Sequence, residues 1–329
     1  MELLTEANLP DCEIVNVGKV QIHVRSKIKN DKKKKERTAI FTDNISAGDE
    51  RLGFGIKNKG KILLWLTIFF KTMFSHIVEN DIVSIDQEYA MASAGINKVR
   101  RRFRNRVLLI EEVIQIPVEC IARGYLVGSF YKAYLKAKLF VLGYILPEGM
   151  KEYDQLEKSL FTPSIKNKEG HDENVSYEEL VVFLRKWLSQ EENKHLKIDA
   201  QTLAQLLRST TLAIFNEAKR FFLERDLILV DWKCEFGLCV DKNGEIILVW
   251  SDEGITPDTS RVWLKESYGE GKIPIGLDKD AVRKWVESHN GDKNVPMEIR
   301  EKTAEAYMLF AEKILPEEYL KKITEEPLY

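Results

Sequence analysis

The sequence predicts a mixed α/β (α+β) protein with a strand-rich front part and a remainder that mixes helices with strands. Three observations support this fold class. Residues 13–41 contain short extended-type runs, several later segments begin with helix caps, and an Asn-Gly pair at 243–244 separates two apolar strands. The 329 residues are enough for one large or two medium domains with a substantial core.

Composition and charge exclude several classes of protein. Apolar residues make up 44% of the chain and charged residues 31%, which is typical of a soluble globular protein. The net charge of −2 gives no global field that recruits nucleic acid or an anionic membrane, and the longest apolar run, 62–70, is too short to span a bilayer. The four cysteines show no metal spacing and no signal peptide opens the chain, so we expect reduced thiols and a cytoplasmic location.

The front of the chain is expected to form short strands followed by a buried helix. The β-branched residues within 15–24 and the segment 39–41 favour extended backbone. The lysine-rich run 29–37 is interpreted as a solvated hairpin loop rather than a nucleic-acid arm. Residues 61–77 have large apolar side chains on most faces, which predicts a well-buried helix. The basic cluster 98–106 is interpreted as a solvated lead-in to a strand, with a nucleic-acid patch or a phosphate-bearing substrate as alternatives.

The remainder is expected to alternate strands with capped helices. Segments 106–110 and 114–118 are typical of strands, and Pro117 indicates an edge or a strand end. Ser176 and Glu179 form a capping-box pattern that begins a helix to Leu188. Further helices are expected over 131–139, from Asp199 to about Arg225, from Asp278, and over 298–315.

The most informative feature is a pair of carboxylates on a predicted hairpin. Asp231, Lys233 and Glu235 follow a buried strand at spacing two, which puts them on one face. A two-residue Asn-Gly turn would set Glu235 opposite Asp252 if no bulge intervenes. Directly opposed like charges destabilise a sheet, so the pair suggests a bound cation, and oxygen ligands beside Lys233 suit Mg²⁺ and nucleotide phosphates. From the hairpin alone, a solvated edge with scattered charge is an equally good interpretation.

Other stretches carry groups suited to anions, although the usual nucleotide motifs are absent. The chain has neither GxxxxGK[ST] nor GxGxxG, so any ATP must bind in another architecture. An arginine, glycines and a serine gather in RGYLVGS at 123–129, and hydroxyls precede an arginine in TPDTSR at 256–261. DNISAGD at 43–49 and HDEN at 171–174 are further polar clusters. Glycine turns, helix caps and a surface histidine are the plain structural alternatives.

Taken together, these stretches resemble the phosphoribosylaminoimidazole-succinocarboxamide synthase (SAICAR synthetase) family of purine biosynthesis. The resemblance is carried, in order, by Gly18-Lys19-Val20, DNISAGD, PVEC running into RGYLVGSFYKAY, FTPSIK, HDEN, LILVDWKCEFG and SDEGITPDTSRVW. These motifs extend from residue 18 to residue 263, which is about three quarters of the 329 residues. The tail after about residue 265 is less diagnostic.

The resemblance implies an ATP-dependent carbon–nitrogen ligase. Such an enzyme joins the carboxylate of 5-aminoimidazole-4-carboxylate ribonucleotide (CAIR) to the amine of L-aspartate, and SAICAR, ADP and phosphate are released. A carboxylate lacks a good leaving group, whereas an acyl phosphate has one, so the protein would mainly position groups and neutralise charge. The implied small molecules are Mg²⁺ as cofactor and ATP, CAIR and L-aspartate, with no nucleic acid or membrane, in a monomer or a homo-oligomer.

The resemblance also implies roles for individual residues. Glu235 and Asp252 would hold Mg²⁺, and Asp231 would orient Lys233 or the substrate's amino group. The catalytic residues would be Lys233, Asp231 and Arg261. The ATP-binding residues would be Gly18, Lys19, Glu112 and Lys233. The ribonucleotide-binding residues would be Asp43, Ser46, Asp49, Arg123, Ser129, Lys132 and Arg261. The loop that closes the site and contacts aspartate would contain His171, Asp172 and Asn174.

The implied fold has two domains with the active site in the cleft between them. An antiparallel nucleotide-binding subdomain is expected over 1–115, with the adenine near 110–120. A larger α/β domain, which carries the ribonucleotide and metal sites and ends in helices, is expected over 116–329. The alternatives are a related ATP-dependent ligase or kinase with an altered substrate, and a non-catalytic nucleotide-binding protein of the same fold.

Four positions depart from the family pattern. Gln21 and Ile22 stand where the motif usually continues with Arg-Asp, so a phosphate-loop arginine is missing and His23 or Arg25 would have to replace it. Gly254 and Ser251 occupy places that are usually apolar.

Overall fold

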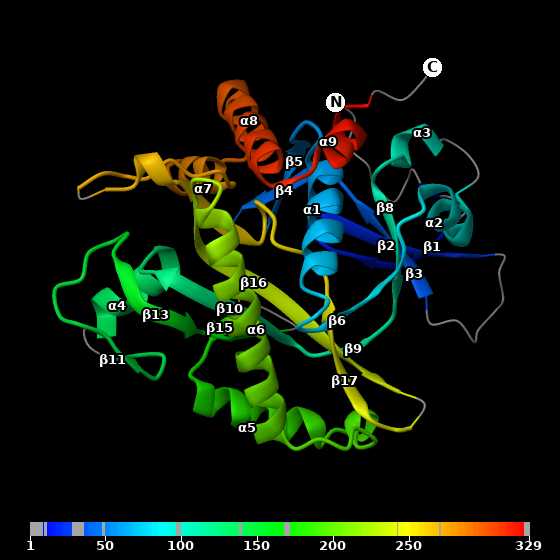
Figure 1. Cartoon of the computed structure of the whole chain (residues 1–329), viewed down its shortest axis with the longest axis horizontal. Helices are drawn as coiled ribbons and strands as arrows, with labels where there is room; N and C mark the ends of the chain where they lie inside the picture. The colour runs from blue at the N-terminus through cyan, green and yellow to red at the C-terminus, as the bar shows by residue number, and fades with distance from the viewer. Residues whose placement is uncertain are drawn as a thin grey trace.

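The structure is a computed structural model, and it describes residues 9, 12–27, 36–47, 50–96, 100–137, 140–167, 172–241, 243–269 and 271–325. Two main sheets lie side by side and helices cover their faces (Figure 1). This mixed arrangement confirms the predicted α+β fold class. Within these residues, no helix is both long enough and apolar enough to cross a membrane.

The first sheet is antiparallel and has the strand order β1-β2-β3-β8-β7. Its strands are β1 (Cys12–Val17), β2 (Gln21–Ser26), β3 (Glu36–Phe41), β8 (Val107–Glu111) and β7 (Ile82–Ser84). Because side chains alternate along a strand, Ile22 and Val24 pack on one face while Gln21 and His23 lie on the other. The apolar face is covered by helices α2 (Gln87–Ala94) and α3 (Arg100–Phe103). Most of the lysine-rich run lies outside the described residues.

A hairpin and a buried helix follow the third strand. The DNISAGD stretch contains the whole of β4 (Asn44–Ala47), which pairs with β5 (Glu50–Gly55), so helix caps do not account for it. Ile45 and Ala47 pack with Val282 further along the chain, and this burial favours a strand there. The helix expected over 61–77 is confirmed as α1 (Lys59–Met73), whose residues are nearly all buried.

The second sheet is built around β16 (Leu227–Val240), a strand of 14 residues. It pairs with β10 (Val118–Tyr125), β17 (Ile246–Ser251), β18 (Ser260–Leu264) and β9 (Ile114–Gln115). The outer strands of the sheet are β6 (Glu79–Asn80), β13 (Gln155–Phe161), β14 (Ser164–Ile165) and β15 (Glu173–Asn174). A separate small hairpin joins β11 (Phe140–Val141) to β12 (Tyr144–Ile145).

Helices flank the second sheet, and α6 crosses one of its faces (Figure 1). The helices are α4 (Gly128–Ala137), α5 (Tyr177–Leu188), α6 (Ala200–Leu223), α7 (Asp280–Ser288), α8 (Met297–Ile314) and α9 (Glu317–Thr324), with short 3₁₀ turns at Glu191–Asn193 and Lys265–Ser267. The predicted capping box of α5 is confirmed, because the Ser176 and Glu179 side chains each accept from the other's backbone N–H. Asp199 caps α6 as the sequence indicated. The sequence analysis missed α2, α3 and α9, which are all short.

One apolar core runs from the first sheet to the second. It includes Phe41 and Leu108 of the first sheet, all of the buried face of α1, and Trp232 and Phe310 beyond it. The chain passes from the first sheet to the second between Glu111 and Ile114. However, β6 precedes this point in the sequence and already belongs to the second sheet. The division into 1–115 and 116–329 therefore stays a prediction.

The carboxylate hairpin has a register that differs by one residue from the predicted one. Residues 241–245 connect the strands, and the Asp241 carboxylate accepts from the backbone N–H groups of Asn243 and Glu245, each at 2.8 Å. Because this longer connection replaces the two-residue turn, Glu235 pairs with Ser251 rather than with Asp252. Asp252 is the first residue after β17 and has φ of 60°, so it has left the extended backbone.

Candidate functional site

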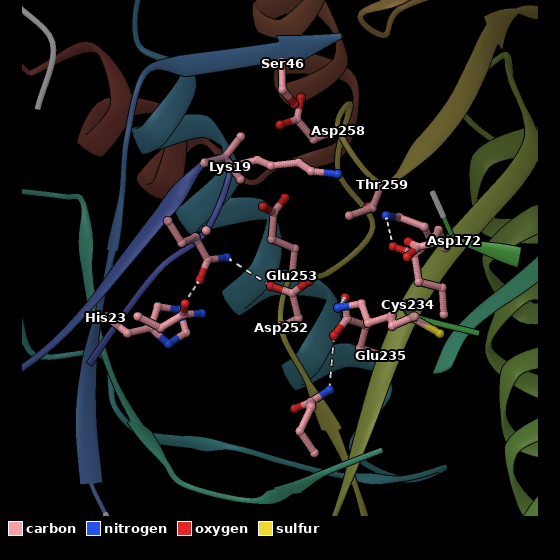
Figure 2. Close-up of a pocket in the computed structure, with 18 of the residues that line it drawn as sticks. Lys19, His23, Ser46, Asp172, Cys234, Glu235, Asp252, Glu253, Asp258 and Thr259 are labelled. Atoms are coloured by element: carbon pink, nitrogen blue, oxygen red, sulfur yellow. Dashed lines mark hydrogen bonds and ion pairs between the residues drawn. The ribbon is translucent and has the colours of Figure 1, made fainter. Parts of the chain in front are cut away.

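A cavity of about 810 Å³ lies between the two sheets (Figure 2). The first sheet and the turn before β2 contribute one side, and β16 with the segment after β17 contributes the other. The predicted site residues that line this cavity are Gly18, Lys19, Ser46, Asp172, Lys233, Glu235 and Asp252. Three residues that the sequence analysis did not select for the site, Glu119, Lys166 and Lys279, add a carboxylate and two ammonium groups.

The two hairpin carboxylates share this cavity despite the corrected register. Glu235 is 8% exposed, and it accepts from Lys166 Nζ at 2.5 Å and from Gln115 Nε2 at 3.1 Å. Burial and then the charge of Asp252 raise the pKa of Glu235 to about 7. The two carboxylates raise each other's cost of ionisation, and a bound cation would offset that repulsion.

The donor set fits Mg²⁺ better than a metal held by protein alone. Among the described residues there is no group of three or more His, Cys, Asp or Glu side chains that could hold an ion. Mg²⁺ commonly takes one or two carboxylates and completes its shell with phosphate oxygens and water. Glu235 and Asp252 match that pattern, and the cavity has room for both of the other ligands.

Lys233 faces the same cavity but has a different partner from the predicted one. Its Nζ pairs with Glu119 Oε1 at 2.6 Å, not with Asp231. Burial alone would lower the pKa of Lys233, but Glu119, and then Glu235 and Asp252, hold it above its ordinary value. Lys233 is therefore a permanent cation beside the carboxylate pair. Glu119 comes from β10, which the register sets beside β16.

Asp231 instead holds two arginines together, outside the residues that line the cavity. It accepts from the Arg261 side chain, from the Arg261 backbone N–H at 3.2 Å, and from Arg123 Nη1 at 3.4 Å. Arg123 is 3% exposed and also donates from Nε to Thr162 Oγ1 at 2.8 Å. Gly128, with φ of 55°, makes room for Arg261, because a Cβ there would lie 2.8 Å from Arg261 Nη2.

The structure thus joins the RGYLVGS and TPDTSR stretches through one carboxylate. A bulge between Leu229 and Asp231 in the pairing of β16 with β18 accompanies this arrangement, and beyond it Asp231 is the register partner of Arg261. Burial lowers the pKa of Arg123 to about 10, although Asp231 opposes that effect, so both arginines stay charged at neutral pH. Ser129 and Lys132 are exposed near the start of α4.

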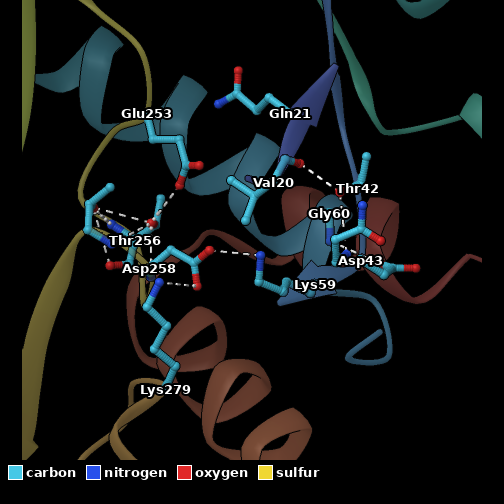
Figure 3. Close-up of polar contacts among 12 residues, drawn as sticks. Val20, Gln21, Thr42, Asp43, Lys59, Gly60, Glu253, Thr256, Asp258 and Lys279 are labelled. Atoms are coloured by element: carbon cyan, nitrogen blue, oxygen red, sulfur yellow. Dashed lines mark hydrogen bonds and ion pairs between the residues drawn. The ribbon is translucent and has the colours of Figure 1, made fainter. Parts of the chain in front are cut away.

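Asp43 has a structural partner that the sequence analysis did not predict. Both of its carboxylate oxygens accept from Arg106, at 2.7 and 2.8 Å. Oδ1 also accepts from the Gly60 backbone N–H at 2.9 Å (Figure 3). Arg106 is therefore buried rather than part of a solvated cluster. With both oxygens engaged, Asp43 anchors the start of α1 and is not among the residues that line the cavity, and its contact with the ribonucleotide stays a prediction.

The other predicted residues are placed less centrally. The Glu112 side chain pairs with Arg25, and Asn174 is exposed in β15. Asp172 lines the cavity, whereas its neighbour His171 lies outside the described residues, as does Asp49. A backbone contact of Glu112 with adenine stays a prediction.

A buried charged network in the cavity wall, which includes the lining residues Asp258, Glu253 and Lys279, was missed by the sequence analysis. Asp258 forms an ion pair with Lys59 at 2.8 Å and lies 3.9 Å from Lys279 Nζ (Figure 3). It also accepts from the Tyr307 hydroxyl at 2.5 Å. Although burial opposes it, Lys279 and Lys59 hold the pKa of Asp258 below its ordinary value. Burial and nearby carboxylates raise the pKa of Glu253 to about 8, and burial lowers that of Lys279 to about 8. Asp258 lies within the TPDTSR stretch, but the sequence analysis selected only the hydroxyls and the arginine there, and no spacing pointed to either lysine.

The fold and the site together are those of a protein with a polar cavity between two sheets, whose lysines and carboxylates suit small charged ligands. The family model described as SAICAR synthetase matches residues 16–298. Phosphoribosylaminoimidazole-succinocarboxamide synthase of Maridesulfovibrio salexigens is 36% identical over 276 residues, which is 82% of this chain and 84% of that protein. The protein of the same name from Pichia angusta is 35% identical over 277 residues, 82% of this chain and 85% of that protein.

A solved structure of the same family is also similar to this chain. SAICAR synthase from Saccharomyces cerevisiae complexed with SAICAR has a TM-score of 0.74 and 28% identity, and the match covers 95% of this chain and 97% of that one. The chain therefore belongs to the SAICAR synthetase family. This membership confirms the predicted family, the ligase class and the place in purine biosynthesis.

Proposed function

We propose that this protein joins L-aspartate to the carboxylate of CAIR at the expense of ATP, giving SAICAR, ADP and phosphate. The observation that carries the proposal is the pair of crowded carboxylates, Glu235 and Asp252, in one cavity with cationic side chains. Family membership supports the substrates, because the relatives carry the name of this reaction.

Glu235 and Asp252 are the residues that would hold Mg²⁺. The ion, when bound, supplies positive charge that offsets the charge of the ATP phosphates. Lys166 pairs with Glu235 in the free protein, so we propose that it turns to a phosphate or a substrate carboxylate when the cation takes its place. Lys233 stays cationic on the other side and neutralises phosphate oxygens, together with Lys19 at the cavity wall.

The remaining steps follow from the chemistry of a carboxylate. Transfer of the terminal phosphoryl group of ATP to a CAIR carboxylate oxygen forms an acyl phosphate and releases ADP. The amine of aspartate then attacks the acyl carbon, the C–O bond to phosphate breaks, and inorganic phosphate leaves. Arg261 and Arg123, held by Asp231, are proposed to bind the ribonucleotide. Further contacts with the ribonucleotide are proposed for Ser129, Lys132 and Ser46. The Asp172 segment is proposed to close over aspartate.

A cytoplasmic location is part of the proposal. Cys120 and Cys234 are register partners on β10 and β16, and no disulfide joins these two thiols. Facing thiols that stay unjoined are typical of a reducing compartment.

An omission assay tests the reaction. Purified protein is incubated with ATP, Mg²⁺, CAIR and L-aspartate, and ADP and SAICAR are quantified with each component left out in turn. We expect stoichiometric ADP and SAICAR only in the complete mixture. ADP formed at the full rate without CAIR or without aspartate, and no SAICAR, would refute the proposed reaction.

A further inference from the structure

Gln21 occupies the position at which the family motif usually has an arginine, and the structure shows that neither expected neighbour replaces the missing cation. The Arg25 side chain is paired with Glu112. Burial, followed by the charges of Arg37 and Lys71, lowers the pKa of His23 to about 3, so its ring is neutral. The chain has therefore exchanged an arginine for a neutral amide at this wall of the cavity.

Gln21 links His23 to one of the two cavity carboxylates. Gln21 Nε2 donates to Asp252 Oδ1 at 3.4 Å, and His23 Nε2 lies 2.9 Å from Gln21 Oε1 (Figure 2). An amide oxygen only accepts, so the neutral ring must carry its proton on Nε2. The other ring nitrogen is buried and has no hydrogen-bond partner among the described residues. His23 thus fixes which end of the Gln21 amide faces Asp252.

A second glutamine does the same for the other carboxylate. Gln115 Nε2 donates to Glu235 Oε2 at 3.1 Å, and the Ser251 hydroxyl donates to Gln115 Oε1 at 3.1 Å. Ser251 is itself a departure from the family pattern, and the corrected register places it opposite Glu235. Each carboxylate therefore receives a neutral N–H donor whose orientation is set by one further side chain.

We infer that Gln21 and Gln115, oriented by His23 and Ser251, are positioning residues that aim Asp252 and Glu235 at one divalent cation. The inference rests on the metal role proposed for the two carboxylates. Asp252 lies beyond the end of β17, so the backbone hydrogen bonds of the sheet do not fix its position. A side-chain donor orients its carboxylate instead. A neutral donor orients a carboxylate and leaves its charge for the cation, whereas an arginine would neutralise it.

The experiment measures binding of Mn²⁺, a probe for oxygen-ligand sites, to the full chain in the presence of ADP, by the electron paramagnetic resonance signal of the free ion. Gln21→Met, Gln115→Met, His23→Leu and Ser251→Ala should each weaken Mn²⁺ binding by about 10-fold. Gln21→Arg should weaken it further. His23→Gln keeps an N–H donor toward Gln21 and should bind Mn²⁺ within about 2-fold of the wild type.

Double variants give a signature that a loss of stability does not produce. His23→Leu should add nothing in a Gln21→Met background, and Ser251→Ala nothing in a Gln115→Met background, because each pair acts as one unit. Changes in different pairs should multiply. Gln87→Met is the matched control, since this glutamine bonds to the Val107 backbone away from the cavity and should leave Mn²⁺ binding unchanged.

Asp252→Asn separates the inference from the function on which it rests. If Asp252→Asn binds Mn²⁺ as the wild type does, the metal role of the carboxylate is refuted, and the inference that depends on it is refuted as well. If Asp252→Asn loses the ion while the glutamine variants keep wild-type affinity, only the positioning role is overturned. Loss of affinity in both sets, with the predicted non-additivity, supports the inference.

Discussion

At the scale of single residues, Glu235 is proposed to hold the metal ion, and its ionisation lowers the free energy of unfolding of the unliganded protein. Glu235→Gln should lower turnover by about 100-fold or more, because the cation would lose a charged ligand. Steady-state ADP formation at saturating Mg²⁺ measures this, with circular dichroism as the check on folding. Turnover within a few-fold of the wild type would remove the metal role of Glu235.

The same substitution should stabilise the unliganded protein at alkaline pH. The pKa of Glu235 is about 7 in the folded state, above the ordinary value of 4.5, so ionising it costs folding free energy as pH rises from about 4.5 to 7. We expect the difference in the free energy of unfolding between Glu235→Gln and the wild type to grow, in favour of the variant, by of order 1–3 kcal/mol from pH 5 to pH 8. Urea denaturation at both pH values, without nucleotide or Mg²⁺, measures the difference. A gain that shrinks with rising pH would contradict the assigned pKa.

Arg261 is the more accessible of the two arginines on Asp231, with 23% of its side chain exposed against 4% for Arg123. Arg261→Gln should raise the KM for CAIR by about 10- to 100-fold and change the KM for ATP by less than about 3-fold, because a charge-assisted bond to the ribonucleotide is lost. Initial rates with each substrate varied in turn give both constants. Equal effects on both substrates would refute the assignment.

At the scale of elements, a glycine decides how the segment after β17 meets helix α1. A Cβ at Gly254 would lie 2.8 Å from Thr67 Cα, and the Gly254 N–H donates to Thr67 Oγ1 at 3.0 Å. The close approach of the two backbones explains why this chain has glycine where the family usually has an apolar residue.

Gly254→Ala should lower the free energy of unfolding by about 1–3 kcal/mol, because two backbone segments must separate. Chemical denaturation measures it. Gly269→Ala is the control, since the nearest atom to a Cβ there is Lys272 Cδ at 3.9 Å. Equal stability of the two variants would show that the contact of Gly254 with α1 has no energetic consequence.

At the scale of the whole molecule, a buried ion pair joins distant parts of the chain. Lys59 at the start of α1 is fully buried against Asp258, which Tyr307 of α8 also contacts. Lys59→Met leaves Asp258 with fewer partners in a buried place and should cost about 3–5 kcal/mol of stability. Thermal unfolding at neutral pH measures the loss.

The double variant Lys59→Met with Asp258→Asn should recover part of that loss, because no unpaired charge remains. Lys302→Met, which removes an exposed pair with Glu298, should leave the melting temperature unchanged. A double variant less stable than Lys59→Met alone would show that the packing of the two side chains matters more than their charges.

Much of the fold was predictable because its signals are local. The helices that begin at Ser176 and Asp199 have caps whose partners lie two or three residues away. The hairpin between β16 and β17 was recognised from its Asn-Gly pair, but its register depended on the Asp241 side chain closing a longer connection. Helices α2, α3 and α9 are short and were missed, since brief periodic patterns carry little information.

The sequence by itself determined the family, the ligase chemistry, and the carboxylates and cations available for it, because these depend on residue types within short motifs. Only the tertiary structure decided the partners of those groups. Lys233 meets Glu119 across 114 positions, and Gln21 meets Asp252 across 231. Such pairs leave no periodic trace in the sequence, since they arise where two sheets and a buried helix pack together, and that packing is why Asp43 anchors a helix while Glu235 faces the cavity.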